Sequence, residues 1–253
     1  MDPDRLRDLI RGLPRSGPGS DAATAEALAR LGRLPPAPRV LDIGCGPGRQ
    51  ALVLARGTGG HVTAVDVDPA GLSRLADAAA DLGLADRIAT RQADMRALPF
   101  PPGSFDLIWS EGAAYIMGFA AALAAWRPLL ETGGAMAVTE LTWLVDRPPA
   151  PAAAFWAANH PAMATVGENC AAAEAAGYRI VETFALPASA WWDEYYDPLS
   201  VRVAGMRRSH GGDTAWVRLL DAIDAEVDLY RRYAEAYGYV FYLLRKKPGA
   251  LVR

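Results

Sequence analysis

Short apolar runs alternate with amphipathic stretches along the first half of the chain. Residues rich in β-branched and other apolar side chains lie at 39–43, 61–66, 87–91, 105–109 and 134–141, with helically spaced apolar positions between them. Strands that alternate with helices are typical of a parallel sheet with helices on both faces. The pattern therefore predicts an α/β fold built on a doubly wound sheet.

Two more strands are predicted near the C-terminus, at 178–186 and 239–246, and about 50 residues separate them. Between them, apolar residues recur at three- and four-residue steps from Thr214 to about Tyr237. This spacing predicts a long amphipathic helix with one packing face. The same face is a candidate interface for a homodimer.

The N-terminal region predicts a helical cap over residues 1–34. Asp4 to Leu13 and Asp21 to Leu34 each carry leucines at helical spacing, and a proline-rich segment at 35–38 separates them from the first strand. The turn-prone segment Gly17–Ser20 lies between the two helices. It has two interpretations, a lid that folds over a binding site or a plain linker.

The most informative segment covers residues 40–48 (VLDIGCGPG), where an apolar strand runs into three glycines at alternate positions. Glycine allows a sharp turn and lets a ligand lie against the main chain, and a helix N-terminus follows. The segment therefore indicates a nucleotide-cofactor loop. It departs from the dinucleotide pattern G-x-G-x-x-G, because Arg49 stands three positions after Gly46.

The second and third predicted strands also end in acidic residues. Asp66 follows Gly44 by 22 residues, about the spacing at which a carboxylate reaches ribose hydroxyls. The third strand leads to Asp94 and Met95. These features favour a nucleotide cofactor, and a nicotinamide-binding protein or a plain core turn is the alternative.

Five segments in order resemble the class I S-adenosylmethionine-dependent methyltransferases: DIGCGPG, VDVDP, QADM, FDLIWSE and LLETGG, within residues 39 to about 141. Within this family, the chain is similar to bacterial proteins related to ubiquinone-biosynthesis C-methyltransferases. The resemblance implies a Rossmann-like fold with a mostly parallel, seven-stranded sheet whose last two strands pair antiparallel. Residues 143–165 (the first insertion) and 187–236 (the second insertion) are then additions, which commonly shape a substrate site.

The resemblance also implies a cofactor site for S-adenosylmethionine, with Asp66 accepting from both ribose hydroxyls. Val67 and Met95 would enclose the adenine, and Asp94 would accept from its amine or, alternatively, cap a helix. Asp42 would bind loop amides or the methionine ammonium, and Gln50 would touch the cofactor or face solvent. The full set of expected cofactor residues is Asp42, Gly44, Cys45, Gly46, Gly48, Gln50, Asp66, Val67, Asp94, Met95 and Ser110.

Methyl transfer from a sulfonium is a one-step displacement, in which the protein mainly aligns the nucleophile and excludes water. A general base is needed only when the acceptor arrives protonated. The candidates are Glu111 and His160, followed by Glu140 and, more weakly, His210 in a predicted surface loop. His160 has a helix-capping role as its alternative.

The insertions are rich in aromatic residues, which indicate a substrate pocket. The expected substrate-binding residues are Tyr115, Trp143, Trp191, Trp192 and Tyr195. Rings beside acidic residues 193 and 194 could wall a pocket for an aromatic substrate or a cationic amine. The alternative is core packing, and if 191–196 is extended, only about half of its rings can face one cavity.

Composition narrows the class of protein. The 253 residues carry 26 basic and 29 acidic side chains, a net charge of −3, which does not favour nucleic acid as a partner. Two cysteines and no long apolar run predict a cytoplasmic protein without disulfides or a membrane span, and no metal site is indicated. We expect a methyltransferase for a small molecule. An RNA or protein methyltransferase and a non-catalytic cofactor-binding protein are the alternatives.

Overall fold

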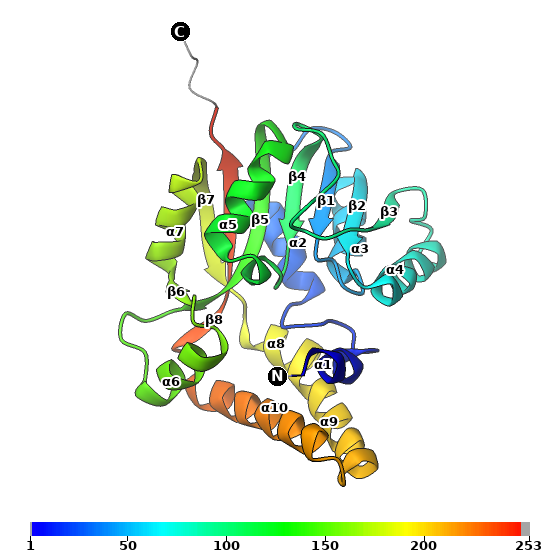
Figure 1. Ribbon diagram of the computed structural model, residues 1–253. Helices are drawn as coiled ribbons and strands as arrows, with labels where there is room; N and C mark the ends of the chain where they lie inside the picture. Colours follow the sequence, from blue (N-terminus) through cyan, green and yellow to red (C-terminus); the bar gives the residue numbers. More distant parts are fainter. Residues whose placement is uncertain (1, 249–253) are drawn as a thin grey trace.

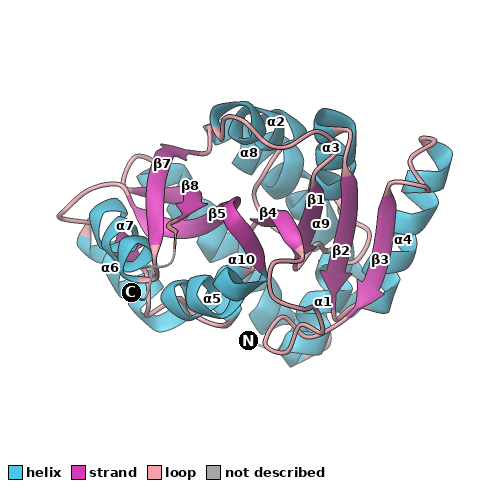
Figure 2. Cartoon of the chain, turned by 90° about the horizontal axis from the view of Figure 1, so that it is seen from above, coloured by secondary structure: helices cyan, strands magenta, loops and turns pink. Residues whose placement is uncertain are grey.

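The computed structural model describes residues 2–248, and its centre is a twisted sheet with helices on both faces (Figures 1 and 2). The strands follow the spatial order β3-β2-β1-β4-β5-β8-β7, and the short β6 pairs with β5 off this path. Their bounds are Arg39–Ile43 (β1), His61–Asp66 (β2), Ile88–Gln92 (β3), Phe105–Ser110 (β4), Leu130–Trp143 (β5), Ala164–Thr165 (β6), Tyr178–Ala185 (β7) and Tyr237–Lys246 (β8).

The helices form three groups, one on each face of the sheet and one beyond the carboxyl ends of the parallel strands (Figure 1). Two short 3₁₀ turns, η1 (Ala114–Ile116) and η2 (Arg127–Leu129), flank α5. The other helical bounds are Pro3–Ile10 (α1), Asp21–Arg30 (α2), Arg49–Thr58 (α3), Pro69–Asp81 (α4), Phe119–Trp126 (α5), Ala150–Asn159 (α6), Val166–Ala175 (α7), Ala188–Trp191 (α8), Trp192–Tyr196 (η3, a π-helical turn), Asp197–His210 (α9) and Thr214–Tyr233 (α10).

Strands β1 to β5 pair in parallel, whereas β8 lies antiparallel between β5 and β7. The predicted doubly wound, mostly parallel sheet is therefore confirmed, and β6 adds a two-residue strand that the sequence did not indicate. The chain order reverses between β1 and β4, where the connections leave toward opposite faces. In open α/β sheets, ligands bind at the carboxyl ends of the strands beside such a reversal.

Three predicted elements differ from the structure. The aromatic segment 191–196 is helical rather than extended, and it continues from α8 through η3 into α9. The helix predicted from Thr214 to Tyr237 ends at Tyr233, because Tyr237 pairs with Trp143 as the first residue of β8. Strand β5 is longer than predicted at both ends: Leu130 at its start pairs with β4, and Thr142 and Trp143 at its end pair with β8 and β6.

The predicted N-terminal cap divides into two parts. Only α1 lies beyond the sheet, near α9 and α10, whereas α2 packs on the sheet face beside α3 (Figures 1 and 2). The small buried residues Ala23, Thr24 and Ala27 allow that close approach. The two insertions supply α6 and α8 to α10, which lie with α1 beyond the carboxyl ends of the strands.

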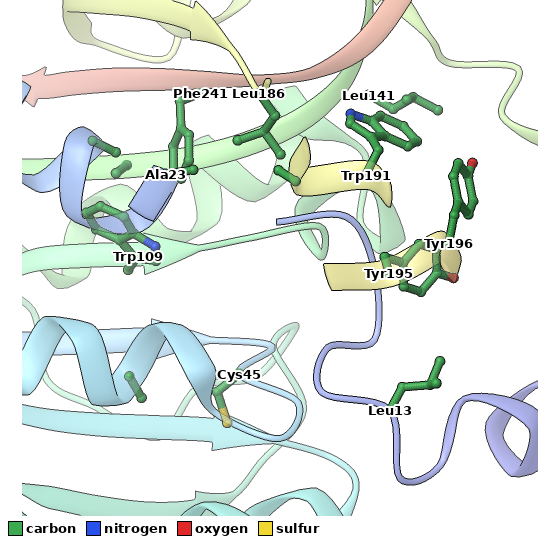
Figure 3. Packing of buried hydrophobic residues seen from close by; sticks show 14 of the residues in the cluster. Leu13, Ala23, Cys45, Trp109, Leu141, Leu186, Trp191, Tyr195, Tyr196 and Phe241 are labelled. Atoms are coloured by element: carbon green, nitrogen blue, oxygen red, sulfur yellow. The ribbon is translucent and has the colours of Figure 1, made fainter. Parts of the chain in front are cut away.

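The second insertion is joined to the rest of the molecule by a buried aromatic cluster. Trp191 is 1% exposed and stacks on Tyr230 of α10, with ring centroids 4.1 Å apart. Figure 3 shows Trp191, Tyr195 and Tyr196 on the helical segment 191–196, and Leu13 of the N-terminal segment belongs to the same buried cluster. The apolar face of α10 is buried in the same cluster, so it is not free to form the homodimer interface considered from the sequence. Within residues 2–248, no helix is both long enough and apolar enough to cross a bilayer.

Candidate functional site

A cavity of about 360 Å³ opens at the carboxyl ends of β1, β2 and β4. Its walls come from the glycine loop after β1, the segments after β2, β3 and β4, and the N-terminal segment from α1 to Pro18. Several of the expected cofactor residues line it: Gly44, Cys45, Gly46, Gln50, Asp66, Val67 and Met95. Segments distant in the sequence therefore meet at the reversal point of the sheet.

The glycine loop is held by main-chain hydrogen bonds and by contacts that exclude a side chain. The amides of Gly44 and Cys45 both donate to the Val65 carbonyl, at 2.9 and 3.1 Å. Gly44 has φ +70°, and a Cβ there would lie 2.5 Å from the Cβ of Ala113. A Cβ on Gly48 would meet Leu75 at 2.4 Å. Both positions require glycine, because a Cβ would collide with a neighbouring element.

Asp66 fixes the loop through both carboxylate oxygens. Its Oδ2 accepts from the Gly46 amide at 2.8 Å, and its Oδ1 accepts from the Asp68 amide at 2.9 Å. Each carboxylate oxygen can accept more than one hydrogen bond, so the group keeps capacity for a ligand hydroxyl. Its place on the cavity wall makes that capacity available.

Asp42 is fully buried behind the loop and is not among the residues that line the cavity. It does not bind the loop amides, because these donate to Val65 and Asp66. Its Oδ1 accepts from Gln50 Nε2 at 3.4 Å, whereas its Oδ2 has no hydrogen-bond partner within residues 2–248. Burial, and then the charge of Glu111, raise the pKa of Asp42 well above its usual range. Asp42 is therefore a buried acceptor that lacks a donor.

The remaining expected cofactor residues lie at different depths. Val67 is 58% exposed on the cavity wall, an apolar side chain open to a flat ligand, and Met95 lies across from the glycine loop. Asp94 is exposed outside the cavity lining; its Oδ1 accepts from the Arg96 amide at 2.9 Å, and no helix starts there. Ser110 is buried, and its hydroxyl donates to the Ile43 carbonyl at 2.9 Å.

Glu111 forms the inner end of a buried ion-pair cluster. Its Oε1 accepts from Thr24 at 2.7 Å and from Trp109 Nε1 at 2.8 Å, and its Oε2 accepts from Arg15 Nη1 at 3.4 Å. Burial raises the pKa of Glu111, and the Arg15 charge opposes that rise. All of these donors are fixed by the fold, so Glu111 ties together β4, α2 and the N-terminal segment.

Arg15 is the residue of this site that the sequence interpretation missed. It is 5% exposed, donates to Asp21 at 2.7 Å as well as to Glu111, and lies 3.9 Å from Glu194 of the second insertion. Its Nε is buried without a hydrogen-bond partner within the described chain. The sequence did hold one signal for this residue: Arg15 begins the Gly/Pro-rich segment 15–20, which was a candidate lid. A lid over a charged ligand needs a side chain of the opposite charge.

Glu140 and His160 form a pair on the acceptor side of the cavity. Glu140 is a buried residue of β5, and His160 directly follows α6. Glu140 Oε1 and His160 Nε2 lie 3.1 Å apart. Burial raises the pKa of Glu140, and the hydrogen bond with His160 opposes the rise. Tyr115, which lines the cavity, packs edge-on against the His160 ring at 5.6 Å. A proton acceptor thus stands next to the cavity wall.

The aromatic residues of the insertions have separate positions. Trp191 and Tyr195 are buried, Trp192 is half-buried beneath Arg231, and Trp143 packs edge-on against Tyr237. None of these four lines the cavity. Helical geometry explains this arrangement, because α8 and η3 wrap their rings around α10 rather than alternating them across an extended strand.

The other chemical candidates lie away from the cavity. His210 is the last residue of α9 rather than part of the surface loop expected for it; it hydrogen-bonds Ser209 at 2.8 Å and packs half-buried on Trp216. Among residues 2–248, no group of three or more His, Cys, Asp or Glu side chains could hold a metal ion.

Comparison with known proteins finds similarity to methyltransferases. Residues 40–134 match the family model described as a methyltransferase domain. A sterol 24-C-methyltransferase of Gibberella zeae is 32% identical over 111 residues, 44% of this chain and 29% of that protein. A 2-methyl-6-phytyl-1,4-hydroquinone methyltransferase of Synechocystis sp. is 41% identical over 81 residues, 32% of this chain and 24% of that protein. The chain spans less than a third of the length of either relative.

A solved structure matches nearly the whole chain. The S-adenosylmethionine-dependent methyltransferase from Geobacter sulfurreducens, solved with S-adenosylhomocysteine, superposes with a TM-score of 0.81. The identity is 22%, and the match covers 98% of this chain and 99% of that one. The likeness therefore extends to the fold of the insertions as well as to the sheet.

Proposed function

We propose that this chain, which carries a class I S-adenosylmethionine-dependent methyltransferase domain, transfers the methyl group of that cofactor to a small-molecule acceptor. The observation that carries the proposal is the cavity at the glycine loop, whose walls include Asp66, the exposed Val67 and the buried Arg15. Two matched relatives are named as methyltransferases of a sterol and of a hydroquinone. These names support a small molecule as the acceptor.

The residues of the cavity fit the chemical groups of S-adenosylmethionine. The methionine end carries an ammonium and a carboxylate. On the cavity wall, Arg15 has an Nε without a hydrogen-bond acceptor, and the Asp42 carboxyl lies behind the glycine loop, where only its charge would act on the ammonium. Asp66 would accept from the ribose hydroxyls, and Val67 with Met95 would cover the adenine faces. Gln50 and the glycines would contact the cofactor through the loop. We place Asp94 and Ser110 outside direct contact in the conformation described.

When bound, the cofactor supplies an activated methyl group on a sulfonium, so no further activation of the donor is needed. The protein's part is to align the acceptor and to exclude water. The N-terminal segment serves the second task, because Arg15 closes it over the cavity through Asp21 and Glu111. This arrangement favours the lid interpretation of segment 17–20.

We assign the proton-accepting role to the Glu140–His160 pair rather than to Glu111. Both oxygens of Glu111 already accept hydrogen bonds from fixed donors, so we treat Glu111 as a positioning residue. The hydrogen bond to Glu140 fixes the His160 ring at Nε2, so Nδ1 is the nitrogen that would accept a proton. Tyr115, on the cavity wall beside His160, would contact the acceptor.

The finer substrate proposal is an aromatic compound or a cationic amine. Tyr115 and the half-buried Tyr239 bring rings to the acceptor side, and Glu140 supplies negative charge. Trp191 serves this region from behind, as packing for Tyr239 at 5.5 Å. Trp143, Trp192 and Tyr195 likewise support the wall instead of forming it.

A cytoplasmic location belongs to the same proposal, and both cysteines, Cys45 and Cys170, are free as a reducing compartment would leave them. A homodimer stays a proposal that would have to use a surface other than the apolar face of α10. Sedimentation of the purified chain would decide that point.

The first experiment is calorimetric titration with S-adenosylmethionine, S-adenosylhomocysteine and NAD, followed by a pooled-metabolite screen for S-adenosylhomocysteine formation. We expect the two adenosyl ligands to bind and NAD not to bind. Turnover on a small amine or phenol would support the proposal. Binding without turnover would favour the non-catalytic or macromolecular alternatives, and binding of NAD alone would refute it.

A further inference from the structure

Glu226 is a carboxylate that the proposed chemistry does not use. It lies on α10 between the buried residues Ile223, Val227 and Tyr230, so this helix directs it inward rather than to solvent. Its Oε1 accepts from the Tyr196 hydroxyl at 3.0 Å. The side chain is half-buried, and burial raises its pKa.

No cation balances this carboxylate within residues 2–248, where Glu226 forms no ion pair. The other acidic residues of α10, Asp221, Asp224 and Asp228, all pair with arginines on the surface. An inward-facing carboxylate without a cation costs stability, because few favourable interactions replace its hydration. Two explanations are open for this carboxylate. Its negative charge serves binding, or its hydrogen bond with Tyr196 offsets the cost of burying it.

Tyrosine rings surround the group. Burial, and next the charge of Glu226, raise the pKa of Tyr195, and Glu226 also contributes to the raised pKa of Tyr115 and Tyr239. Tyr196, which donates to Glu226, has its ring centroid 5.4 Å from that of Tyr195, and Glu194 of the same helical turn lies 3.9 Å from Arg15 on the cavity wall. The faces of aromatic rings attract ammonium groups, and so does the negative charge of Glu226. The tyrosine rings and Glu226 therefore both favour a cationic ligand.

The cluster adjoins the cavity. Tyr115 belongs to the cavity wall, and the Tyr239 hydroxyl lies 3.9 Å from where a Cβ on Gly112 would stand. Gly112 lines the cavity directly after Glu111. An acceptor beside Gly112 would therefore be near Tyr115 and Tyr239, whereas Glu226 does not line the cavity.

We propose that Tyr115 and Tyr239, with the charge of Glu226 behind them, favour an ammonium group of the acceptor, which makes the substrate a cationic amine compound. This inference rests on the proposed function and selects one of the two substrate classes named there. An anionic acceptor is disfavoured, because Glu140 and Glu226 would both repel it. A neutral aromatic acceptor would leave the Glu226 charge without a partner.

Equilibrium binding to the full chain, saturated with S-adenosylhomocysteine, tests the proposal. The probes are three cations, each paired with a neutral analogue of the same number of heavy atoms: choline with 3,3-dimethylbutan-1-ol, phenethylammonium with 2-phenylethanol, and benzyltrimethylammonium with neopentylbenzene. We expect at least one cation to bind about tenfold or more tightly than its neutral analogue. Glu226→Gln should remove that preference and leave the affinity for S-adenosylhomocysteine unchanged.

Two variants separate recognition from folding. Glu235→Gln removes an exposed carboxylate just after α10 and should keep the cation preference, which controls for net charge. Tyr196→Phe removes the hydrogen bond to Glu226 and should lower thermal stability while keeping the preference. Equal binding of cation and neutral analogue in all three pairs, or a preference that survives in Glu226→Gln, overturns the proposal. Failure of S-adenosylhomocysteine itself to bind would instead refute the proposed function.

Discussion

Asp42 shows how the fold tolerates a group that is costly without a ligand. Burial raises its pKa above the value near 3.9 of the unfolded chain, so the folded protein holds the proton to higher pH. Stability attributable to this group therefore falls as pH rises from the unfolded pKa to the folded pKa, and the full cost is present above both. An acidic residue at this position is a compromise between stability and binding.

We predict that Asp42→Asn stabilises the protein at pH 7 by on the order of 1 kcal/mol, or about 2–4 °C in Tm, and weakens S-adenosylmethionine binding. Gln50 can still donate to the amide oxygen. Thermal melts between pH 5 and 8, with calorimetry at pH 7, measure both effects. The exposed Asp86→Asn serves as the charge-matched control, and equal melts for the two variants would contradict the prediction.

Asp66 is expected to be the strongest single determinant of cofactor affinity. We predict that Asp66→Ala weakens S-adenosylmethionine binding at least about tenfold, since a hydrogen bond to a charged group contributes ~1.5–3 kcal/mol. Calorimetry gives the affinity directly. Asp66→Asn, whose single amide oxygen can still accept from one of the two loop amides, is a milder change than Asp66→Ala, and exposed Asp77→Ala is the control. Unchanged affinity in both Asp66 variants would refute the ribose assignment.

For single residues, the sequence predicted which side chains at the strand ends reach the cavity. It did not predict the side chains that other segments bring to them. Asp66 and Val67 follow a strand whose place in the sheet was predictable, so their arrival at the cavity was too. Arg15 and Glu226 belong to segments without a motif, and only tertiary packing brings them inward. The hydrogen-bond partners of Asp42 and Ser110 also depended on atomic detail that spacing does not encode.

Among the elements, the N-terminal segment joins three parts of the molecule through one side chain. We predict that Arg15→Met raises the dissociation rate of S-adenosylhomocysteine about tenfold or more, because its charged hydrogen bonds to Asp21 and Glu111 are lost. Stopped-flow displacement measures the rate. Trypsin should also cut faster after exposed Arg11. The exposed control Arg33→Met should change neither the dissociation rate nor the rate of cleavage. An unaltered dissociation rate in Arg15→Met would mean that the N-terminal segment is a linker and not a lid.

The second insertion depends on Trp191 for its attachment. We predict that Trp191→Ala lowers the free energy of unfolding by about 3–5 kcal/mol, because a buried ring stacked on Tyr230 leaves a cavity. Urea denaturation measures the loss. The neighbouring half-buried Trp192→Ala is the matched comparison and should cost less. If Trp191→Ala and Tyr195→Ala both keep full turnover, these rings serve packing alone.

Helices and strands were predictable where the hydrophobic positions follow a regular pattern, as in α10 and the parallel strands. The segment 191–196 was not, because six consecutive polar-aromatic residues satisfy a strand and a helix equally in isolation. Its conformation is decided by Trp191 and Tyr196 packing on Tyr230, a contact with a helix more than thirty residues later. The small-residue face of α2 likewise allowed two positions, and packing on α3 selected one.

For the molecule as a whole, the cavity lies between the sheet and the cap, so a ligand contacts both. We predict that S-adenosylhomocysteine at about 100 times its Kd adds ~2.7 kcal/mol to the free energy of unfolding and raises Tm by about 5–11 °C. Differential scanning fluorimetry measures the shift. NAD at the same concentration is the control. A Tm that is unchanged by S-adenosylhomocysteine would contradict the assignment of the cavity.

The two ends of the second insertion meet on neighbouring strands. The Leu186 amide, where the insertion begins, donates to the Tyr239 carbonyl at 2.8 Å, just beyond its end at 236. The whole segment therefore leaves and re-enters the sheet at one point, without threading through the cofactor half. Evolution or an engineer could exchange it between related enzymes as a unit. Chimeras joined at 186 and 237 would then inherit their choice of acceptor from the donor of the segment and their cofactor from the recipient.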